Sequence, residues 1–261
     1  MFDLFKSRKR ERLRAEPFPD EWRRTIERNV PIVRRLPPQD RQELFGHVAV
    51  FLAEKHFEGA GGLELTDEIR VTIAAQACLL LLHRDTDYYP LLKSIIVYPS
   101  TYVVPGDQPL GGGLWEEGDD VMLGHTSHRL SAMVLAWDST LHGARSMNDG
   151  ENLVLHEFAH QLDFEAGDAN GTPALGSNAQ YASWARVLGA EYEALRRASE
   201  EGRPSVLDDY GAEDPAEFFA VATEAFFERA VELRAKHPAL YEELRAFYEQ
   251  DPAGWATGET T

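Results

Sequence analysis

The chain has 261 residues, of which 43% are hydrophobic and 27% charged, so its composition is that of a folded globular protein and excludes wholesale disorder. Its single cysteine, Cys78, excludes an intrachain disulfide framework and a cysteine-rich zinc site. The net charge is −18; residues 1–14 carry six basic and two acidic side chains, so the other 247 residues carry −22, a charge that should repel nucleic acid.

The N-terminal segment, residues 1–18, is predicted to be a basic, flexible arm. It lacks the apolar core of a secretory signal, and no run of 18 apolar residues occurs anywhere in the chain. We therefore expect a cytoplasmic protein without a membrane partner. Residues 19–261 are predicted to form one domain with two lobes.

The pattern is helical up to residue 92. Segments 18–33 and 37–58 carry apolar residues at spacings of three and four, with a pair of prolines marking the break between them. Thr66 resembles a helix start before the apolar run from Ile69 to Leu82. Because this run is apolar on nearly every side, we expect a central helix.

The middle of the chain has a different character. Three stretches rich in β-branched and aromatic residues, 93–104, 113–128 and 131–137, are bounded by Gly, Pro and Asp and predict a small mixed sheet. The connection at 105–113, which includes Gly111–Gly113, is interpreted either as a plain hairpin loop or as a lip over a cleft.

Helices are expected again in the C-terminal half. The predicted spans are 151–165, about 178–200, a helix opened by Asp214 and Pro215, and 238–250. Helices, a small sheet and more helices predict an α+β fold.

The helix predicted at 151–165 carries the pattern His-Glu-x-x-His. His156 and His160 are four apart, so their rings share one helix face and can bind one ion, while Glu157 lies beside that ion as a base. The alternative is a solvated helix face. The surrounding residues are mostly apolar, however, and buried histidines need partners, which favours a metal site.

A catalytic zinc ion needs a third protein ligand. Asp163 shares the face of the histidines but is short and one turn further on, so we interpret it as a hydrogen-bond partner of a ligand imidazole or as a structural residue. Glu217 and Glu224 are seven apart on another apolar helix, and either is a candidate ligand. A capping box with Asp214 would also account for Glu217 without any metal.

One tyrosine is a candidate for the same chemistry. Tyr210 lies seven residues before Glu217, and its hydroxyl is suited to stabilise an oxyanion, although a packed loop tyrosine is the simpler interpretation.

Two motifs together resemble a known family. HEFAHQLD and, about fifty residues later, YGAEDPAEFFAVATEAFF are similar to the Mlc titration factor A family of zinc-dependent peptidases and, more distantly, to the catalytic domain of lethal-factor-type metalloproteases. The resemblance covers most of the chain. It implies a zincin-like fold of the gluzincin type, with an active-site helix and one zinc ion per chain.

The same resemblance implies roles for particular residues. It assigns the zinc ligands to His156, His160 and Glu217, the general base to Glu157, and oxyanion stabilisation to Tyr210. Many gluzincins carry an acid four residues after the ligand glutamate, but here that position is Val221. Support for a ligand histidine is therefore expected from Asp163 or Glu224.

We expect from these features a zinc metallopeptidase acting on peptides, with aminopeptidase activity and a repressor partner of the Mlc type implied by the resemblance. The segment 131–137 is a candidate edge strand for an extended peptide, with Ala132, Val134 and Leu135 as substrate contacts. The alternative is a regulatory protein with a structural or vestigial metal that sequesters a protein partner.

Overall fold

The computed structural model describes residues 2–100, 108–110, 114–116, 131–146 and 148–255. The chain divides into two compact units, and neither is a single stretch of sequence. Unit 1 comprises Met1–Leu82 and Leu92–Arg145, and unit 2 comprises His83–Leu91 and Ser146–Thr261. The single two-lobed domain stays a prediction. No helix in the described part has both the length and the apolar composition needed to cross a bilayer.

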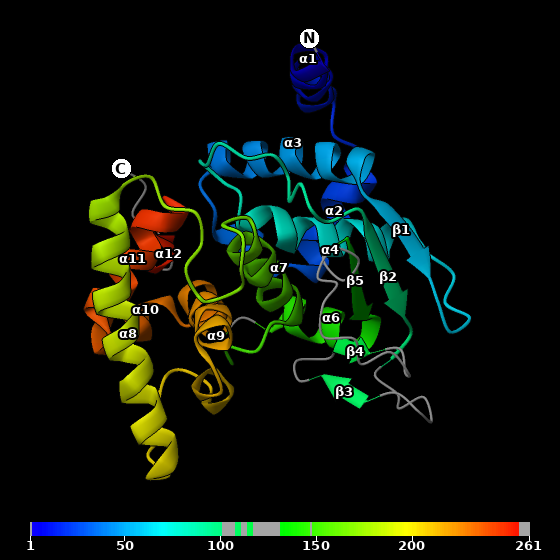
Figure 1. Ribbon diagram of the computed structural model, residues 1–261. Helices are drawn as coiled ribbons and strands as arrows, with labels where there is room; N and C mark the ends of the chain where they lie inside the picture. The colour runs from blue at the N-terminus through cyan, green and yellow to red at the C-terminus, as the bar shows by residue number, and fades with distance from the viewer. Residues whose placement is uncertain (1, 101–107, 111–113, 117–130, 147, 256–261) are drawn as a thin grey trace. The chain divides into compact units, whose positions relative to one another are not determined.

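Unit 1 combines helices with a small parallel sheet (Figure 1). The helical elements are α1 (Phe2–Ala15), α2 (Asp20–Asn29), η1 (Pro31–Arg35), α3 (Pro38–Glu54), α4 (Asp67–Leu79) and α6 (Trp137–Arg145). The three-stranded sheet has the order β1 (His56–Gly59), β2 (Ser94–Tyr98), β5 (Ala132–Ala136), and all its pairs are parallel. A separate antiparallel pair joins β3 (Gln108–Leu110) to β4 (Leu114–Glu116).

The prediction of α+β structure is confirmed, but the sheet differs from the expected mixed one. Antiparallel pairing occurs only in the separate β3–β4 pair among the described residues. Residues 56–58, predicted to be helical, belong to β1, because α3 ends at Glu54 and the residues from His56 onward pair with β2. Within the predicted loop 105–113, Gln108–Leu110 form β3, and within the strand predicted at 113–128, Leu114–Glu116 form β4. The rest of both segments, including Gly111–Gly113, lies outside the described residues.

The N-terminal segment is helical over most of its length, and its predicted flexibility stays a prediction. Residues Phe2–Ala15 form helix α1, which packs against α3. Arg10 is buried there, and its guanidinium donates hydrogen bonds of 2.8 and 2.7 Å to both carboxylate oxygens of Glu54. Such a bidentate pair fixes geometry as well as charge, and here it fastens α1 to the last residue of α3.

Unit 2 is built from helices around an aromatic core. Its elements are α7 (Leu153–Phe164), α8 (Asn178–Glu200), η3 (Asp209–Ala212), α9 (Pro215–Glu228), α10 (Ala230–Lys236), α11 (Pro238–Tyr248) and α12 (Pro252–Trp255). The central helix α9 buries Phe218, Phe219, Phe226 and Phe227 against rings that include Trp184, Tyr241 and Tyr248. Helices α7 and α9 pack against each other, and both are almost wholly buried.

A nine-residue segment of unit 2, His83–Leu91, interrupts the sequence of unit 1. Its Tyr89 is buried and meets the ring of Phe158 edge to face, with ring centroids 4.7 Å apart. Phe158 lies on α7 between the two histidines of the motif. Arg84 of the same segment stacks over Phe247 at 4.1 Å. The segment therefore packs against α7, the helix that carries His156 and His160.

Candidate metal centre

Helix α7 presents two imidazoles on one face. Asn152 is its N-cap, and the side chain of Asn152 accepts a hydrogen bond of 3.0 Å from the backbone N–H of Leu155. One turn of helix separates His156 from His160, and their Nε2 atoms are 3.2 Å apart. Because α7 is apolar and buried, both rings lie in a largely dry environment.

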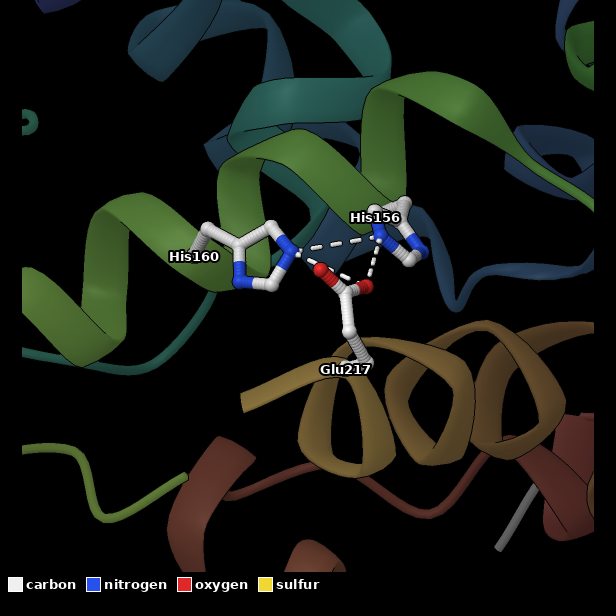
Figure 2. Close-up of side chains that lie close together, drawn as sticks. All are labelled: His156, His160 and Glu217. Atoms are coloured by element: carbon white, nitrogen blue, oxygen red, sulfur yellow. Dashed lines mark hydrogen bonds and ion pairs between the residues drawn. The ribbon is translucent and has the colours of Figure 1, made fainter. Parts of the chain in front are cut away.

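Helix α9 supplies a carboxylate to the same point. Asp214 is the N-cap, and its Oδ1 accepts from the backbone N–H groups of Ala216 (2.7 Å) and Glu217 (3.0 Å). The Glu217 side chain is directed to the imidazoles, with Oε2 3.0 Å from His156 Nε2 and 3.5 Å from His160 Nε2 (Figure 2). The Asp214 half of the capping box predicted from the sequence is thus present, while the carboxylate of Glu217 faces the histidines.

These three atoms have the spacing of ligands around one ion. Edges of 3.0, 3.2 and 3.5 Å join Glu217 Oε2 and the two Nε2 atoms. Donors 2.0 to 2.2 Å from a tetrahedral zinc ion are about 3.3 to 3.6 Å apart. Among the described residues, His156, His160 and Glu217 are the one group of at least three His, Cys, Asp or Glu side chains with this potential. The donor set therefore fits a zinc ion.

Glu224 contacts the far side of one imidazole. Its Oε1 is 2.8 Å from His156 Nδ1, and its Oε2 accepts a hydrogen bond from the backbone N–H of Asn152. A carboxylate at this position holds a proton on Nδ1, so Nε2 is the nitrogen that is available to a metal ion. Two imidazole nitrogens so close together need a shared proton or a cation between them.

Glu157 is buried beside the triangle and has an unsatisfied oxygen. Its Oε1 is inaccessible to solvent and has no hydrogen-bond partner in the described part of the chain. Burial raises the pKa of Glu157 to about 7, against the opposing effect of positive charge on His156 and His160. Buried polar atoms are almost always hydrogen-bonded, so an orphaned one next to a potential metal site indicates a role in binding a missing group.

The pKa values of His156 and Glu217 show that the two side chains share a proton in the buried site. Burial lowers the pKa of His156, but hydrogen bonds to Glu217 and Glu224 outweigh burial and raise this pKa to about 10. Burial also raises the pKa of Glu217, and the hydrogen bonds to both histidines outweigh it and lower this pKa to about 2. The acids around His156 therefore stabilise positive charge on its ring.

Tyr210 lies near the histidines at the end of a short loop. It belongs to η3, where Asp208 accepts a hydrogen bond of 2.8 Å from its backbone N–H, and its ring centroid is 5.9 Å from that of His156. Burial and the neighbouring charges of Glu217 and Glu213 raise the pKa of its hydroxyl. The phenol therefore stays protonated at neutral pH and can act as a hydrogen-bond donor.

Asp163 does not contact either imidazole directly. Its two carboxylate oxygens accept hydrogen bonds from the backbone N–H groups of Gly171 (2.6 Å) and Thr172 (2.8 Å). Of the two interpretations that the sequence allows for this residue, the contacts match the structural one. Val221, the position where many gluzincins carry an acid, is buried.

Two residues that hold Glu224 and the start of α7 in place, Asn152 and Glu228, are not predicted from the sequence. Asn152 caps α7, donates to Glu224 through its backbone and donates to Glu228 Oε1 through its side chain at 3.0 Å. Glu228 in turn accepts from the backbone N–H of Gly150 at 3.1 Å. An asparagine directly before an apolar run is a helix-start signal, but no spacing rule indicates which distant acid it meets.

The proposed substrate strand lies in unit 1. In β5 the side chains of Ala132 and Val134 are partly exposed, whereas Leu135 is fully buried in the core. β5 is the last strand in the order β1–β2–β5, so one of its edges has no partner strand in that sheet as described. The peptide contacts predicted for these residues stay a prediction.

The chain matches one protein family and several proteins of known sequence over most of its length. Residues 4–249 match the model of the family described as glucose-regulated metallo-peptidase M90. The chain is 40% identical over 236 residues to an uncharacterized protein of Synechocystis sp., covering 90% of this chain and 86% of that protein. It is 31% identical over 234 residues to the Mlc titration factor A of Klebsiella pneumoniae, covering 85% and 84%. The same-named protein of Yersinia enterocolitica is 29% identical over 238 residues, covering 89% and 86%.

Proposed function

Because this chain belongs to the glucose-regulated metallopeptidase M90 family, we propose that it is a zinc-dependent peptidase. His156, His160 and Glu217 hold the ion, and Glu157 is the general base. The observation that carries this proposal is the triangle of ligand atoms with the unpartnered Glu157 oxygen beside it.

A zinc ion held by His156, His160 and Glu217 would supply Lewis-acid chemistry to the scissile carbonyl and the attacking water. The residues around it have separate tasks. Glu157 takes the proton of the attacking water and delivers it to the leaving amine. Tyr210 donates its hydroxyl hydrogen bond to the developing oxyanion.

Glu224 has a positioning role in this proposal. By accepting from Nδ1 of His156 it fixes the tautomer and the ring plane, the task that an acid four residues after the ligand glutamate has in many related peptidases. Asn152 ties the same carboxylate to the start of α7.

The proposal is tested by metal content together with hydrolysis. Purified wild type should contain one zinc ion per chain and hydrolyse amino-acid anilides until a chelator is added. Glu157→Gln should keep the zinc and lose turnover, whereas His160→Ala should lose both. Wild-type protein that neither retains nor takes up zinc would refute the proposal.

Aminopeptidase action is the finer proposal. It predicts that anilides with a free α-amine are cleaved and that their N-acetylated counterparts are not. Equal cleavage of the two series would instead indicate endopeptidase action. The peptide is proposed to pair with the edge of β5 that has no partner strand among the described residues, supported by the place of β5 at the end of its sheet. A proline at a residue of β5 whose N–H points away from β2 should then raise KM.

A second candidate function is sequestration of a repressor of the Mlc type. The relatives named Mlc titration factor A support it. Glu157→Gln separates the two functions, because a purely sequestering protein keeps its cellular effect without turnover. Binding of purified repressor by this variant would support sequestration, and absence of binding by wild type would remove it.

A further inference from the structure

The loop that follows the metal-motif helix is fastened to that helix by one carboxylate. Asp163 is fully buried, and its two oxygens accept the backbone N–H groups of Gly171 at 2.6 Å and Thr172 at 2.8 Å. Since Asp163 is three residues after His160, a single rigid helix carries both imidazoles and the anchor of this loop. Burying a carboxylate is costly, so a double backbone contact here indicates a position that must be held accurately.

Gly171 is enclosed on its remaining sides. Its carbonyl accepts a hydrogen bond of 2.8 Å from Trp184 Nε1 of α8, and Trp184 is itself buried against Phe219. Its φ of +75° lies in the left-handed region that favours glycine. A Cβ atom at Gly171 would lie 2.2 Å from the carbonyl oxygen of Pro215. The backbone of α9 therefore rests directly on this glycine.

The position of that contact connects it with the ligand triangle. Pro215 is the first residue of α9, next to the cap Asp214 and two residues before Glu217. A carbon and an oxygen atom in contact are normally about 3.3 to 3.6 Å apart, so a side chain at position 171 would displace Pro215 by roughly 1 Å. Metal ligands must lie within about 0.2 Å of their ideal distances. A displacement at the start of α9 is therefore large on the scale that matters for Glu217.

We propose that Asp163 and Gly171 are positioning residues that set the distance between Glu217 and the two imidazoles. Asp163 holds the loop at a fixed place on α7 through its hydrogen bonds to Gly171 and Thr172. Gly171 in turn allows the first turn of α9 to pack directly against this loop. The inference rests on the proposed function, in which Glu217 is a zinc ligand. It gives the aspartate of the HEFAHQLD motif a task at the third ligand and not at a histidine.

The sharpest test is Gly171→Ala with Gly167→Ala as the matched control. Gly167 lies in the same loop with a φ of +122°, but a Cβ atom there meets nothing within 4 Å. Both variants carry backbone strain, and only Gly171→Ala pushes on α9. The measurements are zinc affinity by competition with a chromophoric chelator, the visible spectrum of the cobalt-substituted protein, and thermal unfolding of the metal-free protein.

Gly171→Ala should bind zinc about 10- to 100-fold more weakly and change the cobalt spectrum, at a temperature where its metal-free form is still folded. Gly167→Ala should match wild type in affinity and spectrum even if it unfolds earlier. Wild-type affinity and spectrum in Gly171→Ala, or equal losses in both variants, would overturn the proposal.

The variant Asp163→Asn is an independent test of the proposal. It takes the place of Gly171→Ala if that variant does not fold. The amide retains one acceptor oxygen and sets an NH2 group against a backbone N–H, so zinc affinity should fall in the same direction. Wild-type affinity in Asp163→Asn would count against the role of Asp163. Failure of wild type to bind zinc would refute the proposed function instead, which keeps the two results distinct.

Discussion

At the scale of single residues, the site depends on which nitrogen of His156 carries the proton. Glu224 is a buried carboxylate with two donors: the ring Nδ1 of His156 at 2.8 Å and the backbone N–H of Asn152. Burial raises its pKa, and the hydrogen bond to His156 opposes that rise. The net shift of the Glu224 pKa is still upward, and the shared hydrogen bond makes the histidine and the acid depend on each other.

We predict that Glu224→Gln weakens zinc binding and lowers kcat without removing either. The amide oxygen can still accept from His156 Nδ1, but its NH2 group then faces the N–H of Asn152, and an unsatisfied buried donor costs about 1 to 3 kcal/mol. Chelator competition and steady-state kinetics measure the effect. The control is Glu242→Gln, which alters an exposed acid on α11. Unchanged zinc affinity in Glu224→Gln would contradict the positioning role.

The sequence predicts some of these residues and not others for a geometric reason. His156, Glu157 and His160 lie within five residues of one helix, so helical periodicity alone predicts that the two rings meet. Glu217 and Glu224 share a face of another helix, and their spacing of seven cannot say which of them reaches the near side of an imidazole. That distinction depends on how α7 packs on α9, which is tertiary information.

At the scale of elements, the start of α9 has two functions. Asp214 caps the helix and so stabilises it, while the same turn holds Glu217 at the histidines. Helix α8 has the same kind of cap but carries no proposed metal ligand: the side chain of Ser177 accepts a hydrogen bond of 3.3 Å from the backbone N–H of Gln180. The two helices therefore allow the effects of a cap on stability and on metal binding to be compared.

We predict that Asp214→Ala lowers the free energy of unfolding of the metal-free protein by about 0.5 to 2 kcal/mol and also weakens zinc binding. Ser177→Ala should lower stability by a similar amount and leave zinc affinity unchanged, since α8 carries no ligand. Urea denaturation and chelator competition give the two quantities. Equal zinc affinity in the two variants would show that the cap contributes only to stability.

Helix boundaries are the part of the fold that the sequence predicts best. Thr66 caps α4, Asn178–Glu200 forms α8, and Pro215 opens α9 as expected, because each start has a capping residue before a periodic run. Residues 56–58 of β1 are predicted as helix because they follow an amphipathic run without a turn signal between them. Only pairing with β2 identifies them as part of a strand.

At the scale of the whole molecule, the excess of acidic side chains extends into the interior of unit 2. Glu228 is buried, close to Asp149 and Glu224, and its hydrogen-bond donors are Asn152 and Gly150. Burial and the two neighbouring acids outweigh the bond from Asn152 and raise the pKa of Glu228 to about 9. The folded protein therefore retains a proton here that the unfolded chain releases.

This shift predicts that the metal-free protein loses stability as the pH rises. A carboxyl whose folded pKa is raised contributes fully below its ordinary value of 4.5, and the contribution is lost as the pH approaches 9. The free energy of unfolding should fall between pH 5 and pH 9, and Glu228→Gln should flatten this slope. Denaturant titrations across that range test it; an identical slope in the variant would contradict the raised pKa.

Metal binding should protect one part of the molecule selectively. Both ligand helices, α7 and α9, belong to unit 2, while α3 and α4 of unit 1 carry no ligand. Zinc at 100 times its dissociation constant stabilises the liganded state by about 2.7 kcal/mol. Hydrogen exchange should slow in α7 and α9 on addition of zinc, with His160→Ala as the control that shows no change. Uniform slowing throughout the chain would contradict a local effect.

The overall class follows from the alternation of helical and strand patterns, but the division of the chain does not. No composition change marks Leu82 or Leu91 as a point where the chain passes between units, because His83–Leu91 is a short stretch of mixed polarity. Its assignment to unit 2 depends on buried ring contacts such as Tyr89 with Phe158, which only the folded arrangement reveals.

The segment His83–Leu91 limits how the protein can be truncated. A fragment beginning at Ser146 would contain every proposed zinc ligand but lack Tyr89, leaving a gap behind Phe158 on the helix that carries both histidines. A truncation that retains the complete ligand set should therefore be a poor minimal enzyme. Supplying a peptide spanning residues 83–91 in trans is the complementation that the architecture suggests.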